Sequence, residues 1–178
     1  MKVLVTGSAG QLGVAITRIL GQDFEVVALR RTELDITDPD AVLQMARRVR
    51  PDVILNCAAY NDVDGAEDDP VTAMAVNGLA VRALATAARE SAAVLVHYGT
   101  DFVFDGGVEE PYDELAVPAP MGVYGTSKLL GEWFACGAAR HYVLRVESLF
   151  GGGAEAGDSD ARRLGSTLDR MVDAMLAG

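Results

Sequence analysis

The amino-acid sequence predicts an α/β fold: a doubly wound parallel sheet with helices on both faces. Short apolar runs rich in valine and leucine, each the length of a buried strand, alternate with segments that have the apolar period of a helix. A parallel connection needs a helix to return the chain to the next strand, so the alternation indicates parallel pairing. Two helical segments open with Asp-Pro, an N-cap followed by proline at the first helical position.

The expected elements follow one another without an internal repeat. Strands are expected at residues 2–6, 24–29, 52–56, 94–99 and 141–150, and helices at 11–21, 38–50, 69–90 and 123–137. Residues 105–122, which are rich in proline, glycine and acid, are expected to form a long loop beside a site. A further loop and a helix are expected after residue 150.

Composition and charge narrow the class of protein. The chain has 178 residues with 15 basic and 26 acidic side chains, and its net charge of −11 disfavours nucleic acid as a partner. The sequence opens with a strand-like run, and we find no apolar run of the ~20 residues that cross a bilayer, so we expect a cytoplasmic protein with no membrane partner. Cys57 and Cys136 are expected to be free thiols, and no metal site is expected.

Three glycines mark the turn after the first strand as a phosphate-binding turn. Gly7, Gly10 and Gly13 follow the first strand and open the first helix. In that context one glycine permits the tight turn, one lets a pyrophosphate approach the backbone, and one lets the helix pack on the strand. We therefore expect a dinucleotide at this turn, contacted also by Gln11 and Leu12 at the start of the helix.

The residues that follow the second and third strands suggest where the rest of the cofactor lies. Arg30 occupies the position where proteins that prefer NAD usually carry an acid, and a guanidinium there suits a 2′-phosphate. NADPH is therefore favoured, with NADH as the alternative. Asp35 and Ile36 are expected near the adenine. After the third strand, Ala58, Ala59 and Tyr60 are expected beside the phosphates and ribose.

Several motifs in a fixed order carry a family resemblance over residues 1–151. They are the glycine turn, NCAAYNDVDGAEDDP (56–70), VHYGTDFVFDG (96–106), PAPMGVYGTSK (118–128) and YVLRVESLFG (142–151). With them the sequence resembles the extended short-chain dehydrogenase/reductases, and within these the dTDP-4-dehydrorhamnose reductase-like family. The resemblance implies a Rossmann fold, a homodimer, and NADPH-dependent reduction of a ketone on a nucleotide-linked deoxysugar or of another small carbonyl compound.

The resemblance also implies a catalytic set of Thr100, Tyr124 and Lys128. Tyr124 would give a proton to the substrate carbonyl, Thr100 would hydrogen-bond that carbonyl, and Lys128 would bind the nicotinamide ribose. Asn77 matches a polar position associated with proton relay. Tyr124 and Lys128 are four residues apart, hence on one face of the expected helix, and an ammonium near the phenol would lower its pKa from ~10.

Departures from the family pattern bear on the substrate and on the length of the chain. Related 4,6-dehydratases carry glutamate where this chain has Phe102, so simple reduction is favoured over dehydration. Gly99, Gly122 and residues 146–148 also differ from the usual reductase motifs, which predicts an altered sugar-facing surface. Relatives are longer, so residues 1–150 are expected to be the NAD(P)-binding domain, and 151–178 the start of a truncated substrate-binding lobe.

Two alternatives remain open at this point. A non-catalytic NADP-binding or regulatory protein of the same fold would carry the same cofactor turn. His97 could be a catalytic base, although a strand histidine packed beside the site is the favoured interpretation. Trp133 and Phe134 are expected to pack within the helix layer or to form a subunit face.

Overall fold

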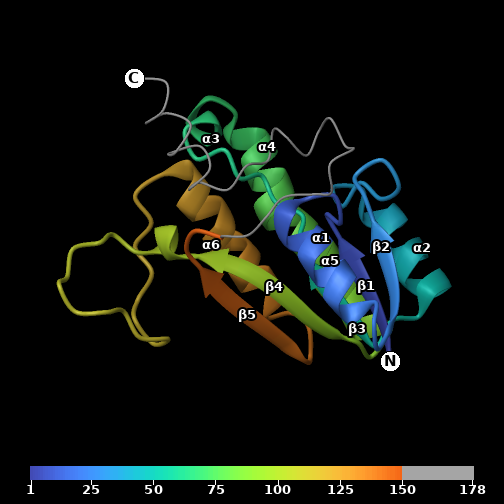
Figure 1. Cartoon of the computed structure of the whole chain (residues 1–178). Helices are drawn as coiled ribbons and strands as arrows, with labels where there is room; N and C mark the ends of the chain where they lie inside the picture. Colours follow the sequence, from blue (N-terminus) through green and yellow to red (C-terminus); the bar gives the residue numbers. More distant parts are fainter. Residues whose placement is uncertain (150–178) are drawn as a thin grey trace, which may run out of the picture.

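The computed structural model describes residues 1–149, which form one parallel sheet with helices on both faces (Figure 1). The five strands are β1 (Lys2–Thr6), β2 (Glu25–Leu29), β3 (Val53–Asn56), β4 (Val94–Thr100) and β5 (His141–Val146). Their order in the sheet is β2-β1-β3-β4-β5, and every pair is parallel. The predicted doubly wound parallel sheet is confirmed.

The order of the strands creates a switch point between β1 and β3. The chain leaves β1 to form β2 on one side and later returns to form β3 on the other side. Thr6 pairs with Leu29 of β2 and with Asn56 of β3, so the carboxyl ends of the three strands lie at one edge. Ligands of doubly wound sheets bind at such an edge, outside the carboxyl ends of the strands.

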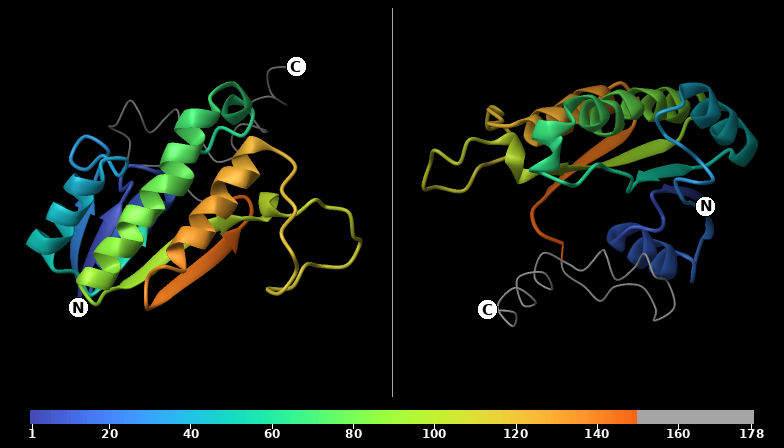
Figure 2. Two further views of the ribbon diagram at one scale, coloured as in Figure 1. Left: turned by 180° about the vertical axis from the view of Figure 1, so that it is seen from behind. Right: turned by 90° about the horizontal axis from the view of Figure 1, so that it is seen from above.

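The helices are divided unequally between the two faces of the sheet. Within residues 1–149, α1 (Gln11–Leu20) covers one face, while α2 (Pro39–Val49), α5 (Ala80–Glu90) and α6 (Val123–Ala135) cover the other (Figure 2). Short elements complete this part of the chain: α3 (Gly65–Asp68), α4 (Pro70–Met74), the π-helical turn η1 (Ala75–Leu79) and the 3₁₀ turn η2 (Asp101–Val103).

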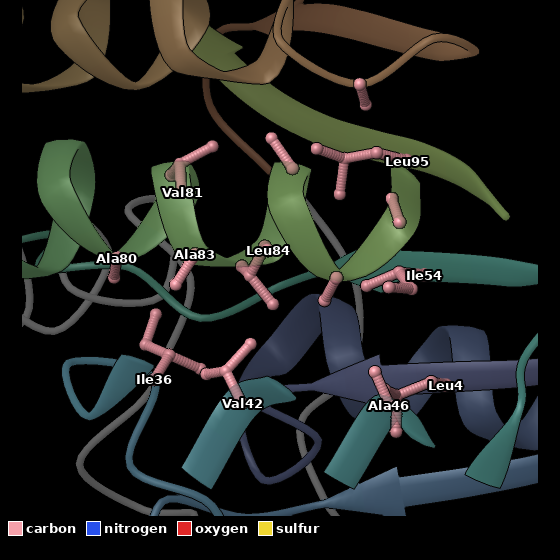
Figure 3. Packing of buried hydrophobic residues seen from close by; sticks show 14 of the residues in the cluster. Leu4, Ile36, Val42, Ala46, Ile54, Ala80, Val81, Ala83, Leu84 and Leu95 are labelled. Carbon is pink, nitrogen blue, oxygen red and sulfur yellow. The ribbon is translucent and has the colours of Figure 1, made fainter. Parts of the chain in front are cut away.

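Two apolar clusters hold these layers together. The larger joins the sheet to α2 and α5, where Leu4, Ile54 and Leu95 contact helical residues such as Val42 and Leu84 (Figure 3). The smaller joins Val3, Val5 and Leu55 on the opposite face to Ile16 and Leu20 of α1. Because successive strand residues point to opposite faces, the almost continuous apolar runs in the sequence supply both clusters.

The two Asp-Pro sequences begin helices as predicted. The side chain of Asp38 accepts hydrogen bonds from the backbone N–H groups of Asp40 and Ala41, both at 3.0 Å. The side chain of Asp69 accepts one from the N–H of Thr72 at 3.1 Å. Each carboxylate satisfies N–H groups that a helix leaves without an intrahelical partner.

The long helix predicted at 69–90 has a π turn in its middle. It runs from α4 through η1 into α5, and the break coincides with the closest approach of α6. A Cβ built on Gly78 would lie 2.6 Å from Cδ2 of Leu130, and one on Gly131 would lie 2.2 Å from the carbonyl oxygen of Asn77. The periodicity predicted the extent of this helix, but not the local widening at its contact with α6.

The expectation that no segment is long and apolar enough to cross a bilayer was wrong by length and composition, because the helix Pro70–Glu90 meets both criteria. Its most apolar window is 56% buried inside the structure. Ala80, Val81, Leu84 and Ala88 of α5 are part of the larger cluster, which accounts for its apolar character. Its composition is therefore that of a helix packed on a sheet.

Two other elements differ from the prediction. The strand expected at 141–150 ends at Val146, and the short helix α3 was not predicted. The loop at 105–122 is present without helix or strand. The loop and helix expected after residue 150, and with them the proposed start of a second lobe at 151–178, lie outside the described residues.

Candidate active site

The predicted site residues follow the carboxyl ends of four neighbouring strands. Gly7 follows β1, Arg30 follows β2, Ala58 lies just after β3, and Thr100 is the last residue of β4. The parallel register brings these ends to one edge of the sheet. Residues from distant parts of the sequence are thus gathered where a ligand of this fold binds.

Each glycine of the first turn has a distinct geometric role. Gly7 adopts φ +64°, and a Cβ there would lie 2.5 Å from the backbone nitrogen of Ala58. A Cβ on Gly13 would lie 2.4 Å from the carbonyl oxygen of Gly7, so this glycine lets α1 approach the turn. Gly10 is the N-cap of α1, and the nearest atom to its Cβ position is the Gly7 carbonyl at 3.3 Å. Only glycine readily adopts the positive φ of Gly7, and no residue with a Cβ fits at Gly7 or Gly13.

The start of α1 is suited to an anion. Gly10 brings no capping side chain to this helix end. The first residues after it, Gln11 and Leu12, belong to the end of the helix where backbone N–H groups point outward and the macrodipole is positive. The Nε2 group of Gln11 also donates a hydrogen bond to the carbonyl oxygen of Leu149 at 3.3 Å. The turn and helix therefore fit the pyrophosphate predicted for them.

The residues expected around the adenosine differ in their exposure. Arg30 is exposed beside the turn, where the Leu29 carbonyl before it accepts a hydrogen bond from Ser8 N–H at 3.1 Å. The Asp35 carboxylate accepts bonds from the hydroxyl and N–H of Thr37, which lower its pKa. Ile36, in contrast, is 5% exposed and packs in the larger apolar cluster. Contact of these residues with adenine stays a prediction.

Asn77 links the segment after β3 to the helix that carries Tyr124. Its side chain accepts a bond from Tyr60 N–H at 2.8 Å and donates to the Tyr60 carbonyl at 2.9 Å and to Oγ of Ser127 at 3.0 Å. The Ser127 hydroxyl in turn donates to the carbonyl of Tyr124 at 2.7 Å. Asn77 is 1% exposed, so in this structure it holds the backbone around Ala59 and Tyr60 against α6.

Thr100 and Tyr124 are brought together at the end of β4. The N–H of Phe102 donates to Oγ1 of Thr100 at 3.2 Å, and the Thr100 hydroxyl donates to Oδ1 of Asp101 at 3.0 Å. Burial above all, together with the charge of Asp101, raises the pKa of the Tyr124 phenol, while the neighbouring Thr100 side chain acts to lower it. The net pKa lies above the ordinary value of 10.0. The Tyr124 and Phe102 rings also pack at an interplanar angle of 87°, with their centroids 5.7 Å apart. A Cβ on Gly125 would lie 2.3 Å from the Phe102 carbonyl, so glycine permits this close packing.

Lys128 lies one turn further along α6, on the same face. It is 4% exposed, and its Nζ donates a hydrogen bond to the carbonyl oxygen of Tyr98 at 2.6 Å. Burial lowers its pKa from 10.5 to about 8, while the charge of Glu132 acts in the opposite direction. The ammonium is thus held by β4, one residue before Gly99.

The expected lowering of the Tyr124 pKa by Lys128 was wrong for this structure. The Lys128 ammonium donates its hydrogen bond to the Tyr98 carbonyl. The pKa of the partly buried Tyr124 phenol is set mainly by its loss of solvent. A phenol with a raised pKa keeps its proton at neutral pH. That is the form needed to donate a proton to a carbonyl oxygen.

His97 is a packed strand histidine, as the favoured interpretation predicted. Its Nδ1 lies 3.1 Å from Nδ2 of Asn56, whose Oδ1 accepts a bond from the Thr6 hydroxyl at 2.7 Å. The ring is 1% exposed, and burial together with Lys128 lowers its pKa to about 3. A neutral ring with so low a pKa is a poor general base near pH 7.

Of Trp133 and Phe134, only Phe134 packs within the helix layer, and a subunit face at Trp133 stays a prediction. Trp133 is 66% exposed, whereas Phe134 packs against the larger apolar cluster. Their positions in α6 explain the difference, because adjacent residues of a helix point in different directions.

Three contacts near the site were missed from the sequence. Glu67 of α3 accepts a hydrogen bond from the N–H of Val123 at 2.7 Å, at the start of α6. Ser127 joins Asn77 to Tyr124, and Glu132 pairs with Arg145 of β5. Only Glu132 carried a local signal, because it lies four residues after Lys128 and hence on the same helix face.

Comparison with known proteins agrees with this geometry. The RmlD substrate binding domain family matches residues 1–167. Among curated relatives, dTDP-4-dehydrorhamnose reductase of Burkholderia thailandensis is 46% identical over 132 residues, which are 74% of this chain and 44% of that protein. The Streptomyces griseus protein of the same name is 43% identical over 153 residues, 84% of this chain and 50% of that protein. The chain spans about half the length of these two relatives.

Solved structures share the fold over most of the chain. Bacillus anthracis dTDP-4-dehydrorhamnose reductase in complex with NADP has a TM-score of 0.84 and 34% identity, covering 92% of this chain and 59% of that one. Thermus thermophilus UDP-glucose 4-epimerase in complex with NAD has a TM-score of 0.77 and 26% identity, covering 90% and 59%. The chain therefore belongs to the RmlD substrate binding domain family, the family of the dTDP-4-dehydrorhamnose reductases.

Proposed function

We propose that this protein reduces a ketone on a nucleotide-linked deoxysugar with NADPH, and that Tyr124 donates the proton. The observation that carries the proposal is the place of Tyr124 at the carboxyl end of β4, where its ring packs on Phe102, two residues after Thr100, and one helical turn from a buried Lys128. The glycine turn lies at the same edge of the sheet. A proton donor and a dinucleotide turn on one sheet edge are the parts that carbonyl reduction requires.

The residues of this edge have separate tasks in the proposed reaction. Gly7, Gly10 and the start of α1 would hold the pyrophosphate, and the cradle built by the glycines fits such a group. The bound nicotinamide supplies the hydride. Thr100 orients the substrate carbonyl toward the Tyr124 phenol, which keeps its proton near neutral pH. Lys128 holds its ammonium beside the Tyr98 carbonyl, where it would bind the ribose.

The preference for NADPH is proposed from Arg30. Its exposed guanidinium follows β2 beside the glycine turn, where a 2′-phosphate would meet it. The relative from Bacillus anthracis was solved in complex with NADP, which supports the same choice. Arg30→Ser should weaken NADPH binding at least about tenfold and leave NADH binding unchanged, because the lost contact is to the phosphate alone. Arg89→Ser, at the exposed end of α5, is the matched control, and equal affinities for NADH and NADPH in the unaltered protein would remove the argument.

The catalytic assignment is tested by Tyr124→Phe. General acid catalysis contributes about 10²–10⁴-fold, so the variant should lose at least about 100-fold in NADPH oxidation that depends on dTDP-4-dehydrorhamnose. Its affinity for NADPH should not change. Tyr142→Phe removes the same hydroxyl from an exposed position on β5 and should keep full activity.

The same experiment separates the enzyme from its alternative. A non-catalytic NADP-binding or regulatory protein would bind NADPH equally well in all three forms. It would show no oxidation that depends on the substrate. That outcome would replace the proposed reductase with the binding protein.

We also propose a cytoplasmic homodimer. The outer side of the helix layer exposes large apolar residues, with Leu79 of η1 53% and Trp133 of α6 66% exposed. Apolar side chains at such positions are typical of subunit interfaces. Sedimentation equilibrium should give a dimer that Trp133→Glu dissociates, whereas Ile19→Glu, an exposed position on α1, should leave the dimer intact. A monomer at micromolar concentration would refute the proposal.

A further inference from the structure

An ion pair with a buried carboxylate and a partly exposed guanidinium lies beside Lys128. Glu132 of α6 is 5% exposed and receives hydrogen bonds from Arg145 of β5, from Nε at 3.1 and 3.2 Å and from Nη2 at 2.8 Å. Two nitrogens of the guanidinium thus contact the carboxylate, the geometry of the stronger arginine–carboxylate pairs. Burying the carboxylate costs desolvation energy, which offsets much of what the pair contributes to stability.

The strand beneath the pair has no side chain where the carboxylate lies. A Cβ built on Gly99 would be 2.3 Å from Oε1 of Glu132 and 3.2 Å from Cγ of Arg145. The preceding residue, Tyr98, supplies the carbonyl that holds Nζ of Lys128. Lys128 and Glu132, one helical turn apart, are therefore seated on consecutive residues of β4.

Arg145 is itself held in place from its other side. Its Cζ lies 5.0 Å from the centroid of the Phe104 ring, which stacks on Tyr112 with the centroids 4.2 Å apart. The Tyr112 hydroxyl donates a hydrogen bond to Asp105 at 2.6 Å. The guanidinium is thus fixed between a carboxylate and an aromatic ring, which restrains the carboxylate as well.

We propose that Glu132 is a positioning residue that keeps Lys128 charged and seated on the Tyr98 carbonyl, and that Arg145 fixes the Glu132 carboxylate for this task. The role of the charge in catalysis rests on the proposed function. The charge itself is a property of the chain that can be measured without turnover. Burial lowers the pKa of Lys128 to about 8, and the negative charge of Glu132 is what opposes that fall.

Other charged or titratable groups near Lys128 do not supply this opposition. The elements packed around it carry Tyr124 on α6 and Cys136 at its C-cap, His97 and Tyr98 on β4, Asp101 on η2, Glu67 and Asp68 on α3, Arg82, Arg89 and Glu90 on α5, and His141, Tyr142 and Arg145 on β5. His97 is neutral near pH 7, since its pKa is lowered to about 3. Asp101 and Glu67 are exposed, where water screens their charges. Glu132 is the buried anion on the same helix face as the ammonium.

Two substitutions separate this role from a purely structural ion pair. Glu132→Gln keeps the shape and removes the negative charge, so the pKa of Lys128 should fall by about one unit. Arg145→Met removes the competing cation and leaves the carboxylate to Lys128, so the same pKa should rise. If the pair were purely structural, either substitution would loosen α6 from β5, and the pKa of Lys128 would shift in the same direction in both variants.

The sequence makes the measurement selective, because Lys2 and Lys128 are its two lysines. The full chain labelled with ¹³C and ¹⁵N lysine gives side-chain signals that can be followed by NMR against pH, with Lys2 as internal reference. Glu90→Gln is the matched control, since Glu90 forms an exposed pair with Arg47 at 3.0 Å. That control should leave the titration of Lys128 unchanged.

The proposal predicts a downward shift in Glu132→Gln, an upward shift in Arg145→Met and none in Glu90→Gln. An unchanged Lys128 titration in folded Glu132→Gln would overturn it, as would shifts of the same sign in both site variants. If Glu132→Gln does not fold, Arg145→Met carries the test alone. It should show the upward shift, and an unchanged or lowered Lys128 titration in it would overturn the proposal.

The titration is independent of turnover, so its failure can be told from failure of the proposed function. If both proposals hold, the alkaline limb of the pH profile of kcat/KM should move to lower pH in Glu132→Gln by the same interval as the NMR titration. A shifted titration in a protein without turnover would support the positioning role and remove the reductase. Turnover with an unshifted Lys128 titration would support the reductase and remove the positioning role of Glu132.

Discussion

Replacing Gly7 by alanine tests the turn on which cofactor binding depends. The residue has φ +64°, a conformation that costs a residue with a Cβ roughly 1–2 kcal/mol. In addition, the new Cβ would lie 2.5 Å from Ala58 N and 2.7 Å from the carbonyl carbon of Cys57, backbone atoms that cannot turn away. Overpacking of this kind costs about 1–3 kcal/mol, so the free energy of unfolding should fall by about 3 kcal/mol in total.

Gly106 provides a matched control for this substitution. It has nearly the same backbone conformation, φ +68°, but nothing lies within 4 Å of its Cβ position. Gly106→Ala should therefore lose only the conformational part, about 1 kcal/mol. Urea unfolding followed by circular dichroism, with an unchanged slope, measures both variants. Equal losses in the two variants would refute the close contact between the turn and the end of β3.

The same pair of variants should differ in their response to the cofactor. A ligand at 100 times its Kd stabilises the folded state by about 2.7 kcal/mol. NADPH should give that gain to the unaltered protein and to Gly106→Ala, but not to Gly7→Ala, because the displaced turn no longer fits the pyrophosphate. An equal gain in Gly7→Ala would place the phosphates elsewhere.

Three further predictions concern the helices and the buried lysine. Asn77→Ala should lower the free energy of unfolding in urea by about 2–3 kcal/mol, because buried polar groups of Tyr60 and Ser127 lose their hydrogen-bond partner. A loss smaller than that of an exposed Asn→Ala change would contradict these hydrogen bonds. Asp38→Ala should lose about 1 kcal/mol in the same assay as its helix cap is removed, and no loss would argue against the cap. Below pH 8, Lys128 is charged in both the folded and the unfolded state, and burial of the charge disfavours the folded state. Between pH 8 and 10.5 the folded state releases the proton first, so the free energy of unfolding should rise with pH by up to about 3 kcal/mol relative to Lys128→Met. Parallel pH profiles of stability for the two proteins would refute the lowered pKa of Lys128.

The sheet and the glycine turn were predictable because their signals are local. A strand buried on both faces needs a continuous apolar run, and β1, β3 and the first half of β4 have one. Gly7 and Gly13 occupy positions where other residues clash, so their spacing predicts the turn. The place of Thr100 at the end of β4 followed from the same strand assignment.

The features that were not predictable depend on contacts between distant segments. The π turn at η1 coincides with the close approach of α6, which no period in residues 69–90 encodes. The pair of Glu132 and Arg145 forms because α6 and β5 pack together over Gly99, and the spacing of the two residues carries no signal for it. The pKa of Tyr124 could not be predicted from the position of Lys128, since burial governs it.

The role of Tyr124 is tested most directly by substrate-dependent oxidation of NADPH. Absorbance at the nicotinamide band, recorded with and without dTDP-4-dehydrorhamnose, gives the rate for the unaltered chain, Tyr124→Phe and Tyr142→Phe. We expect turnover in the unaltered chain and in Tyr142→Phe, and a loss of at least about 100-fold in Tyr124→Phe at the same NADPH affinity. Equal turnover in Tyr124→Phe and the unaltered chain would contradict the assignment of Tyr124 as the proton donor.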